Sequence, residues 1–214
     1  MKFVIAGYGH FGRIALARLK DSFPDTQVFV IENDKEKLHE EFPSGTITVR
    51  KDAVGFLCNS DVLEMDDFVI PMVPFHLAAS YISAKVPNIS ETSLPEEIAA
   101  VAVNSIRMNF SNLLVSKADF LCPDDCSEGE TCTVTGRINE PLYDTLTSIR
   151  VPGFSVLVQR SYQILPGVGG YPVRDLTKLL DRITLGRHLV VTSCKCHAII
   201  TALEQNLQKG NPAR

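Results

Sequence analysis

Short apolar runs alternate with amphipathic segments through the first half of the chain. Runs rich in Val, Ile and Phe predict strands at residues 2–6, 27–31, 45–49 and 67–70. Ile14, Ala15 and Leu19 recur at helical spacing after the first run, and residues 77–85 predict a helix after the fourth. Strands that alternate with helices form parallel sheets, so we expect an α/β fold with a doubly wound, mostly parallel sheet.

The same alternation continues in the second half. Further strands are predicted at residues 113–120, 154–162 and 189–192. Helices are predicted at residues 94–107, 141–149, 173–183 and 197–207, the first of them from Ile98, Val101, Ala102 and Ile106. These units are expected to extend the parallel sheet. The chain divides into domains at 1–88 and 89–214, although no low-complexity linker separates them and one continuous domain is the alternative.

Three glycines follow the first predicted strand, and together they indicate a dinucleotide site. Gly7 would make the turn, Gly9 would let a pyrophosphate approach, and Gly12 would let the helix pack on the strand. His10 and Phe11 lie in the same turn, at the helix N-terminus that would hold the phosphates. The second strand ends at Glu32, about 20 residues past Gly12, where a carboxylate accepts from a ribose diol. That carboxylate favours NAD(H) over NADP(H).

Residues 2–82 resemble the NAD-binding Rossmann domain of bacterial potassium-uptake regulators, with Gly7, Gly9 and Gly12 as the fingerprint and residues 31–34 as the acidic strand end. The resemblance implies a Rossmann-like fold, nucleotide binding, and regulation of transport rather than catalysis. Residues 49–53 depart from the Gly-Asp pattern usual in such domains. The second half does not resemble the ligand-binding domain that usually accompanies them.

Cysteines are concentrated in two loops of the second half. The chain has six cysteines, and five of them fall at Cys122, Cys126, Cys132, Cys194 and Cys196, with His197 beside the last. If both loops follow strands of one parallel sheet, these six side chains share a metal site, for zinc or for an iron–sulfur cluster. A structural zinc, a cluster or redox thiols near the NAD, and merely buried cysteines are the alternatives. Cys58 is expected in the core.

Two further side chains are candidates for chemistry. His76 begins a helix at the carboxyl end of the fourth strand and could act as acid or base, or could simply hydrogen-bond to the loop. Arg160 could anchor a small anionic substrate, or pair with an acid of the cysteine loop. The glycine-rich stretch 165–171 is expected to be a loop, either an anion cradle or a tight turn. All these loops are expected to line one crevice.

Composition limits the class of protein. The chain has 214 residues, 45% of them hydrophobic, and a formal net charge of −4, and it shows no basic face for nucleic acid and no apolar run of membrane length. Its first strand begins directly after Met1, which predicts a cytoplasmic protein without a signal peptide. The expected partner is a small-molecule ligand, and a homodimer is left open. Two functions follow from the sequence: an NAD-dependent oxidoreductase acting on a small anionic substrate at a cysteine-lined crevice, or a non-catalytic NAD or redox sensor with a structural metal or iron–sulfur site.

Overall fold

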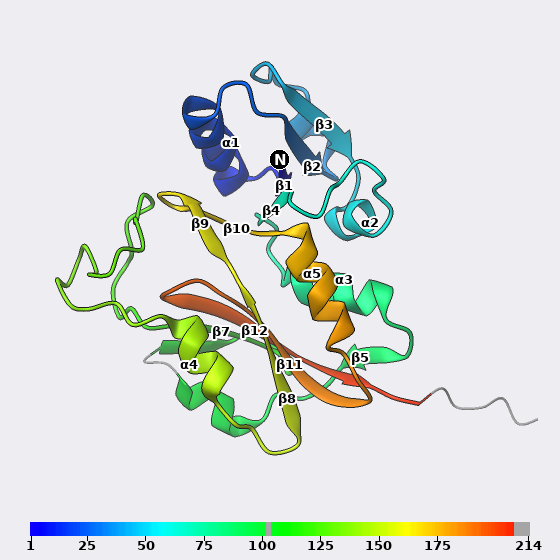
Figure 1. Ribbon diagram of the computed structural model, residues 1–214, viewed down its shortest axis with the longest axis vertical. Coiled ribbons are helices and arrows are strands. Elements are labelled where there is room, and N and C mark those ends of the chain that lie inside the picture. The colour runs from blue at the N-terminus through cyan, green and yellow to red at the C-terminus, as the bar shows by residue number, and fades with distance from the viewer. Residues whose placement is uncertain (102–103, 208–214) are drawn as a thin grey trace, which may run out of the picture.

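The protein, described here by a computed structural model at residues 1–101 and 104–207, has a mixed α/β fold with two β-sheets (Figure 1). The first sheet contains four parallel strands in the spatial order β3-β2-β1-β4. These strands are β1 (Phe3–Ala6), β2 (Val28–Glu32), β3 (Thr46–Arg50) and β4 (Phe68–Pro71). The four strands expected in the first half of the sequence are therefore present.

Two strands from the second half complete this sheet. β9 (Tyr162–Leu165) and β10 (Val168–Pro172) form a hairpin, and β10 pairs antiparallel with β4. A Cβ atom on Gly170 would lie 2.5 Å from the carbonyl oxygen of Val69, so only glycine lets the two strands approach this closely. The glycine-rich stretch expected to be a loop is thus largely strand.

The second sheet has the order β6-β7-β12-β11-β8, and β5 pairs with β12 beside this path. β8 and β11 are parallel, whereas the other pairs are antiparallel. The strands are β5 (Ile89–Glu91), β6 (Asn104–Arg107), β7 (Asn112–Ser116), β8 (Phe154–Arg160), β11 (Gly186–Ser193) and β12 (His197–Gln205). The expectation that the second half prolongs the parallel sheet is therefore wrong.

Helices cover both sheets and join them (Figure 1). The α-helices are α1 (His10–Ser22), α2 (Ala53–Cys58), α3 (Leu77–Lys85), α4 (Leu142–Ser148) and α5 (Val173–Asp181), and Lys35–Leu38 and Glu96–Val101 form 3-10 turns. α1 packs on one face of the first sheet. α3 and α5 lie between the sheets, because one cluster joins Val69, Ile82, Leu179 and Val190. α4 packs on the far face of the second sheet.

Two predicted helices are wrong. Residues 197–205 form β12, a central strand. Its Ile200 and Leu203 are both fully buried and belong to different core clusters, so both faces of the strand are covered. A strand covered on both faces gives a continuous apolar run, which periodicity cannot distinguish from a buried helix. The predicted helix 94–107 is a 3-10 turn at Glu96–Val101 and the strand β6, while residues 102 and 103 lie outside the described part.

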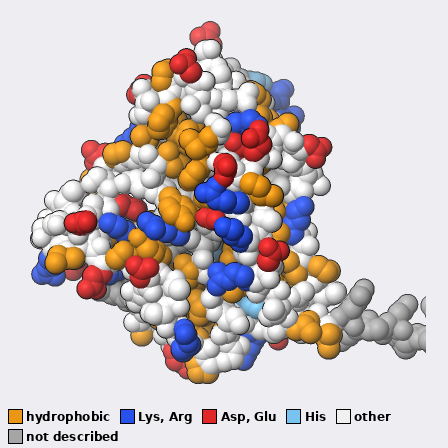
Figure 2. All heavy atoms as spheres, in the orientation of Figure 1, with side chains coloured by type: hydrophobic (Ala, Val, Ile, Leu, Met, Phe, Trp, Pro, Cys, Tyr) orange, Lys and Arg blue, Asp and Glu red, His pale blue; other side chains and the backbone are white. Residues whose placement is uncertain are grey.

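Within residues 1–101 and 104–207, no helix is long and apolar enough to cross a membrane. Figure 2 shows one face of the molecule, on which Lys and Arg side chains near the centre are interleaved with Asp and Glu side chains.

Candidate functional site

Three glycines shape the turn between β1 and α1, and each meets a different environment. Gly7 has φ +101°, and a Cβ there would lie 2.7 Å from the carbonyl oxygen of Met72. A Cβ on Gly12 would lie 2.3 Å from the carbonyl oxygen of Gly7, so α1 packs directly on the turn. Around Gly9, by contrast, nothing lies within 4 Å of a Cβ position. Packing requires the first and third glycines, whereas the second faces free space.

The N-terminus of α1 is available to an anion. Gly9 is its N-cap residue, no side chain caps it, and its first turn carries no acidic residue. The first N–H groups of a helix lack intrahelical partners and carry a partial positive charge. His10 and Phe11 form this first turn, and both side chains are exposed.

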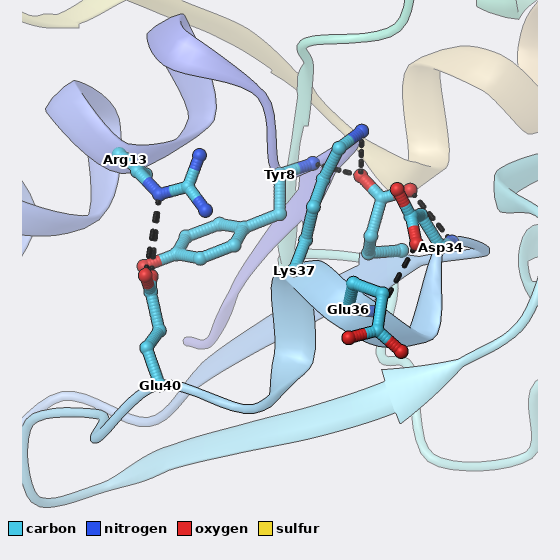
Figure 3. Close-up of polar contacts among 7 residues, drawn as sticks. Tyr8, Arg13, Asp34, Glu36, Lys37 and Glu40 are labelled. Carbon is cyan, nitrogen blue, oxygen red and sulfur yellow. Dashed lines mark hydrogen bonds and ion pairs between the residues drawn. The ribbon is translucent and has the colours of Figure 1, made fainter.

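Glu32 fixes the other side of the turn. Its carboxylate accepts hydrogen bonds from the N–H groups of Tyr8, at 2.7 Å, and Asp34, at 2.9 Å, and Lys37 Nζ lies 3.4 Å away (Figure 3). Burial by itself raises the pKa of Glu32, but these donors outweigh burial and hold the pKa below its usual value. A charged carboxylate therefore stands beside the glycine turn.

Tyr8 is held in turn by a small polar network. Its ring lies 5.0 Å from the Arg13 guanidinium and 5.1 Å from the ring of Phe42. Arg13 donates to a carboxylate oxygen of Glu40 at 3.3 Å, and Glu40 also hydrogen-bonds the Tyr8 hydroxyl (Figure 3). These contacts fix the backbone N–H that Tyr8 donates to Glu32.

A pocket of about 710 Å³ opens at the carboxyl ends of the parallel strands, and we call it the glycine-turn pocket. It is lined by Gly7, Gly9, Phe11, Ile31, Glu32, Asn33, Lys37, Lys51, Asp52, Ala53 and residues 71–75. Sequence reasoning did not include Lys51 and Asp52, because residues 49–53 lack the expected Gly-Asp pattern. Their position directly after β3 was the available signal, since ligands of such sheets bind at the strand carboxyl ends.

His76 does not line the glycine-turn pocket. It is the N-cap residue of α3, and its buried ring contacts the second sheet. Nδ1 lies 2.8 Å from the hydroxyl of Thr201, and Nε2 lies 2.8 Å from the hydroxyl of Thr192. Burial lowers the pKa of His76 to about 3. The ring is therefore neutral at pH 7, and the two threonines occupy both of its nitrogens.

Arg160 lies at the end of β8, where its guanidinium stacks between two tyrosine rings. The centroids of Tyr143 and Tyr162 are 4.3 and 4.7 Å away. A further pocket lies beside His76, which lines it together with Glu91 and Thr201. Arg160 lines neither this pocket nor the glycine-turn pocket. The structure thus places His76 and Arg160 in different surroundings.

A separate cavity of about 240 Å³, which we call the cysteine cavity, lies among residues 117–139 and Cys196. Four thiols line it: Cys122, Cys126, Cys132 and Cys196. The other two expected ligands lie beside it, with His197 Nε2 3.7 Å from Cys122 Sγ and Nδ1 3.9 Å from Cys194 Sγ. Cys58 lies elsewhere, at the end of α2.

The expectation of one crevice that contains both the thiols and the glycine turn is wrong. The glycine-turn pocket and the cysteine cavity share no lining residue. The reason is topological, because the cysteine loops follow strands of the second sheet and not of the parallel sheet.

Comparison with known proteins places the chain in a family. Residues 72–206 match the family described as "Uncharacterized protein, C-terminal domain", and the chain belongs to it. An "Uncharacterized protein" of Archaeoglobus fulgidus is 30% identical over 148 residues, which cover 65% of this chain and 66% of that protein. The chain thus spans just under two thirds of the length of this relative. No solved structure matches.

Proposed function

We propose that the protein binds NAD(H) in the glycine-turn pocket and acts as a sensor of this nucleotide. The observation that carries the proposal is the contrast among the glycines: packing requires Gly7 and Gly12, whereas the space before Gly9 is free. These are the roles of the three glycines in a Rossmann dinucleotide fingerprint. The parallel order β3-β2-β1-β4 also corresponds to half of a Rossmann-like sheet.

The charged Glu32 supports NAD(H) as the ligand. Its two oxygens each accept one backbone N–H, which leaves further lone pairs for the hydroxyls of an adenosine ribose. A 2′-phosphate at the same place would meet a negative charge. We therefore expect the protein to prefer NADH to NADPH.

The far end of the pocket favours a sensor over an oxidoreductase. Reduction of a carbonyl by hydride needs a proton donor near the nicotinamide. Residues 71–75 line the pocket beside β4, which lies on the opposite side of β1 from β2 and Glu32, and none of them has a titratable side chain. His76 follows directly, but its nitrogens bind Thr192 and Thr201. A regulatory role also agrees with the resemblance to potassium-uptake regulators.

Residues 71–76 also connect the glycine-turn pocket to the second sheet. Pro74 and Phe75 line the glycine-turn pocket, and the next residue, His76, bonds to β11 and β12. We propose that nucleotide binding is transmitted through this connection to the second sheet. We also propose that the ligand is a small molecule and that the protein is cytoplasmic.

Titration calorimetry with Gly9→Val tests the proposal. A valine side chain at residue 9 enters empty space, so thermal unfolding should change little, while NADH binding should weaken tenfold or more, about 1.4 kcal/mol. Equal NADH affinity in both proteins would refute the site. Steady oxidation of NADH in the presence of a carbonyl substrate would refute the sensor role alone.

A further inference from the structure

We propose that the cysteine cavity holds an iron–sulfur cluster bound by four thiolates: Cys122, Cys126, Cys132 and Cys196. The proposal rests on the second half of the chain and is independent of nucleotide binding. Each thiol loses its proton when its sulfur binds iron, so cluster binding releases four protons per chain.

The loop that carries three of these cysteines has almost no core of its own. Between β7 and α4, residues 117–141 contain no helix and no strand beyond an isolated antiparallel bridge between Thr131 and Ile138, and Ala118 is their one buried residue. Irregular segments of this length are usually functional or mobile. Bonds to a metal cluster would supply the stabilisation that apolar burial does not.

The orientation of side chains in this loop reverses the usual order. Leu121 and Ile138 are 97% and 83% exposed, whereas all three cysteines of the loop are half-buried. Apolar side chains normally take the inner positions and leave the outer ones to polar groups. Cysteines therefore occupy partly buried positions of the loop while large apolar side chains are exposed, as a thiolate ligand set requires.

Two turns already direct N–H groups at sulfur. Hydrogen bonds from the Thr135 side chain, and then from the N–H groups of Thr135 and Val134, lower the pKa of the Cys132 thiol. Burial raises the pKa of the Cys194 thiol, although the N–H groups of Cys196 and His197 lie toward it in the same i+2 and i+3 arrangement and lower the pKa. Hydrogen bonds to sulfur stabilise the thiolate and tune the cluster that it binds.

Hydrogen bonds also connect the two cysteine loops. The N–H of Lys117 donates to the carbonyl oxygen of Cys196 at 2.8 Å, and Lys195 Nζ donates to the carbonyl oxygen of Gly129 at 3.1 Å. The carbonyl oxygen of Cys126 accepts from the N–H of Gly167 at 3.1 Å and from the side-chain amide of Gln163 at 2.6 Å. Cys196 is thereby fixed against the long loop.

The room inside the cysteine cavity favours a cluster over one zinc ion. Zinc binds four thiolates at about 2.3 Å, which places the sulfurs roughly 3.8 Å apart around one point. Across residues 1–101 and 104–207, no three His, Cys, Asp or Glu side chains are grouped closely enough to hold one metal ion. The four thiols are instead among the residues that line a cavity of about 240 Å³. A cluster in which each thiolate binds its own iron suits this wider arrangement.

Cys194 and His197 become positioning residues in this assignment. Neither lines the cavity, and the N–H of Cys194 donates to the carbonyl oxygen of His197 at 3.0 Å, which fixes the turn that presents the fourth thiolate. His197 Nε2 lies 3.7 Å from Cys122 Sγ. Residues of this kind orient a ligand without binding the metal.

Analysis of iron and acid-labile sulfide in the full chain, purified without oxygen, tests the proposal. Absorption and electron paramagnetic resonance spectra of the same sample complete the test. We expect about four irons and four sulfides per chain and a brown protein that bleaches in air. Stoichiometric zinc without sulfide, or protein with neither metal, would overturn the proposal. This measurement uses unaltered protein, so it does not depend on whether variants fold.

Serine variants then test the ligand set. Replacing Cys122, Cys126, Cys132 or Cys196 should lower bound iron at least fivefold, whereas Cys58→Ser should leave it unchanged. Cys194→Ser should keep its iron and alter only the spectrum. If Cys194→Ser loses iron as completely as the other four, or if those four keep it, the assigned ligands are wrong.

Discussion

The buried ring of His76 makes the stability of the protein depend on pH. The hydroxyl of Thr201 donates to the side-chain oxygen of Asn112, so Thr201 accepts from Nδ1–H of His76, and Nε2 accepts from Thr192. A neutral imidazole satisfies every partner in this chain. A second proton would place a charge in an environment that excludes water.

The magnitude follows from the two pKa values. In the folded protein burial lowers the pKa of His76 to about 3, whereas the unfolded chain has the ordinary value near 6.5. The unfolded state therefore binds the extra proton first. The contribution to stability is fully present above pH 6.5 and is lost as the pH falls toward 3, by about 1.4 kcal/mol per pH unit. From pH 7 to pH 5 the loss is about 2 kcal/mol.

Urea unfolding of the natural protein and of His76→Gln, at pH 7 and pH 5, measures this contribution. Glutamine keeps a donor and an acceptor but does not titrate in this range, so its stability should fall by about 2 kcal/mol less than that of the natural protein. Glu91 lines the pocket beside His76, and the pKa of His197 is lowered by burial. The substitution changes neither Glu91 nor His197, so their contributions to the free energy of unfolding are the same in the two proteins and cancel in the comparison. Equal losses in the two proteins would refute the reasoning.

Three other substitutions test separate parts of the structure. Gly12→Val should prevent folding or lower the melting temperature by more than 10 °C in circular dichroism, because α1 must leave β1; an unchanged melting curve would contradict the packing. Asp67→Ala should cost about 2–4 kcal/mol in urea unfolding, since it leaves the N–H groups of Lys2 and Glu64 without their acceptor; a loss below about 0.5 kcal/mol would contradict this. Arg160→Ala should cost about 1 kcal/mol or less and leave NADH affinity unchanged, and a tenfold loss of affinity would restore Arg160 as a ligand anchor.

The sequence predicted the four parallel strands of the first sheet well because their signals are local. β1, β2 and β4 are each a short apolar run that ends at a glycine, an acid or a proline, and Gly7, Gly9 and Gly12 lie within one turn. The assignment of Glu32 beside that turn also needed only its distance along the chain. Its bonds to Tyr8 and Asp34 were not visible from residue types.

The second half was harder because long-range pairing decides its structure. β12 contains Ala, Leu, Glu and Gln, which favour helices, and only its position between β7 and β11 makes it a strand. The return of β9 and β10 to the first sheet has no local signal either. The cysteine loops do follow strands that end at one edge, because β7 and β11 both pair antiparallel with β12, but that edge belongs to the second sheet and not to the parallel sheet that was expected. The domain division at residue 88 stays a prediction.

Amide chemical shifts of isotopically labelled protein, recorded during titration with NADH, test the central claim most directly. If the nucleotide binds at the glycine turn, the N–H resonances of Gly9, His10, Phe11 and Gly12 should shift most, because these groups face the pyrophosphate. The same titration with NADPH should give shifts only at higher concentration. Shifts confined to the cysteine cavity, or no shifts at millimolar NADH, would contradict the account.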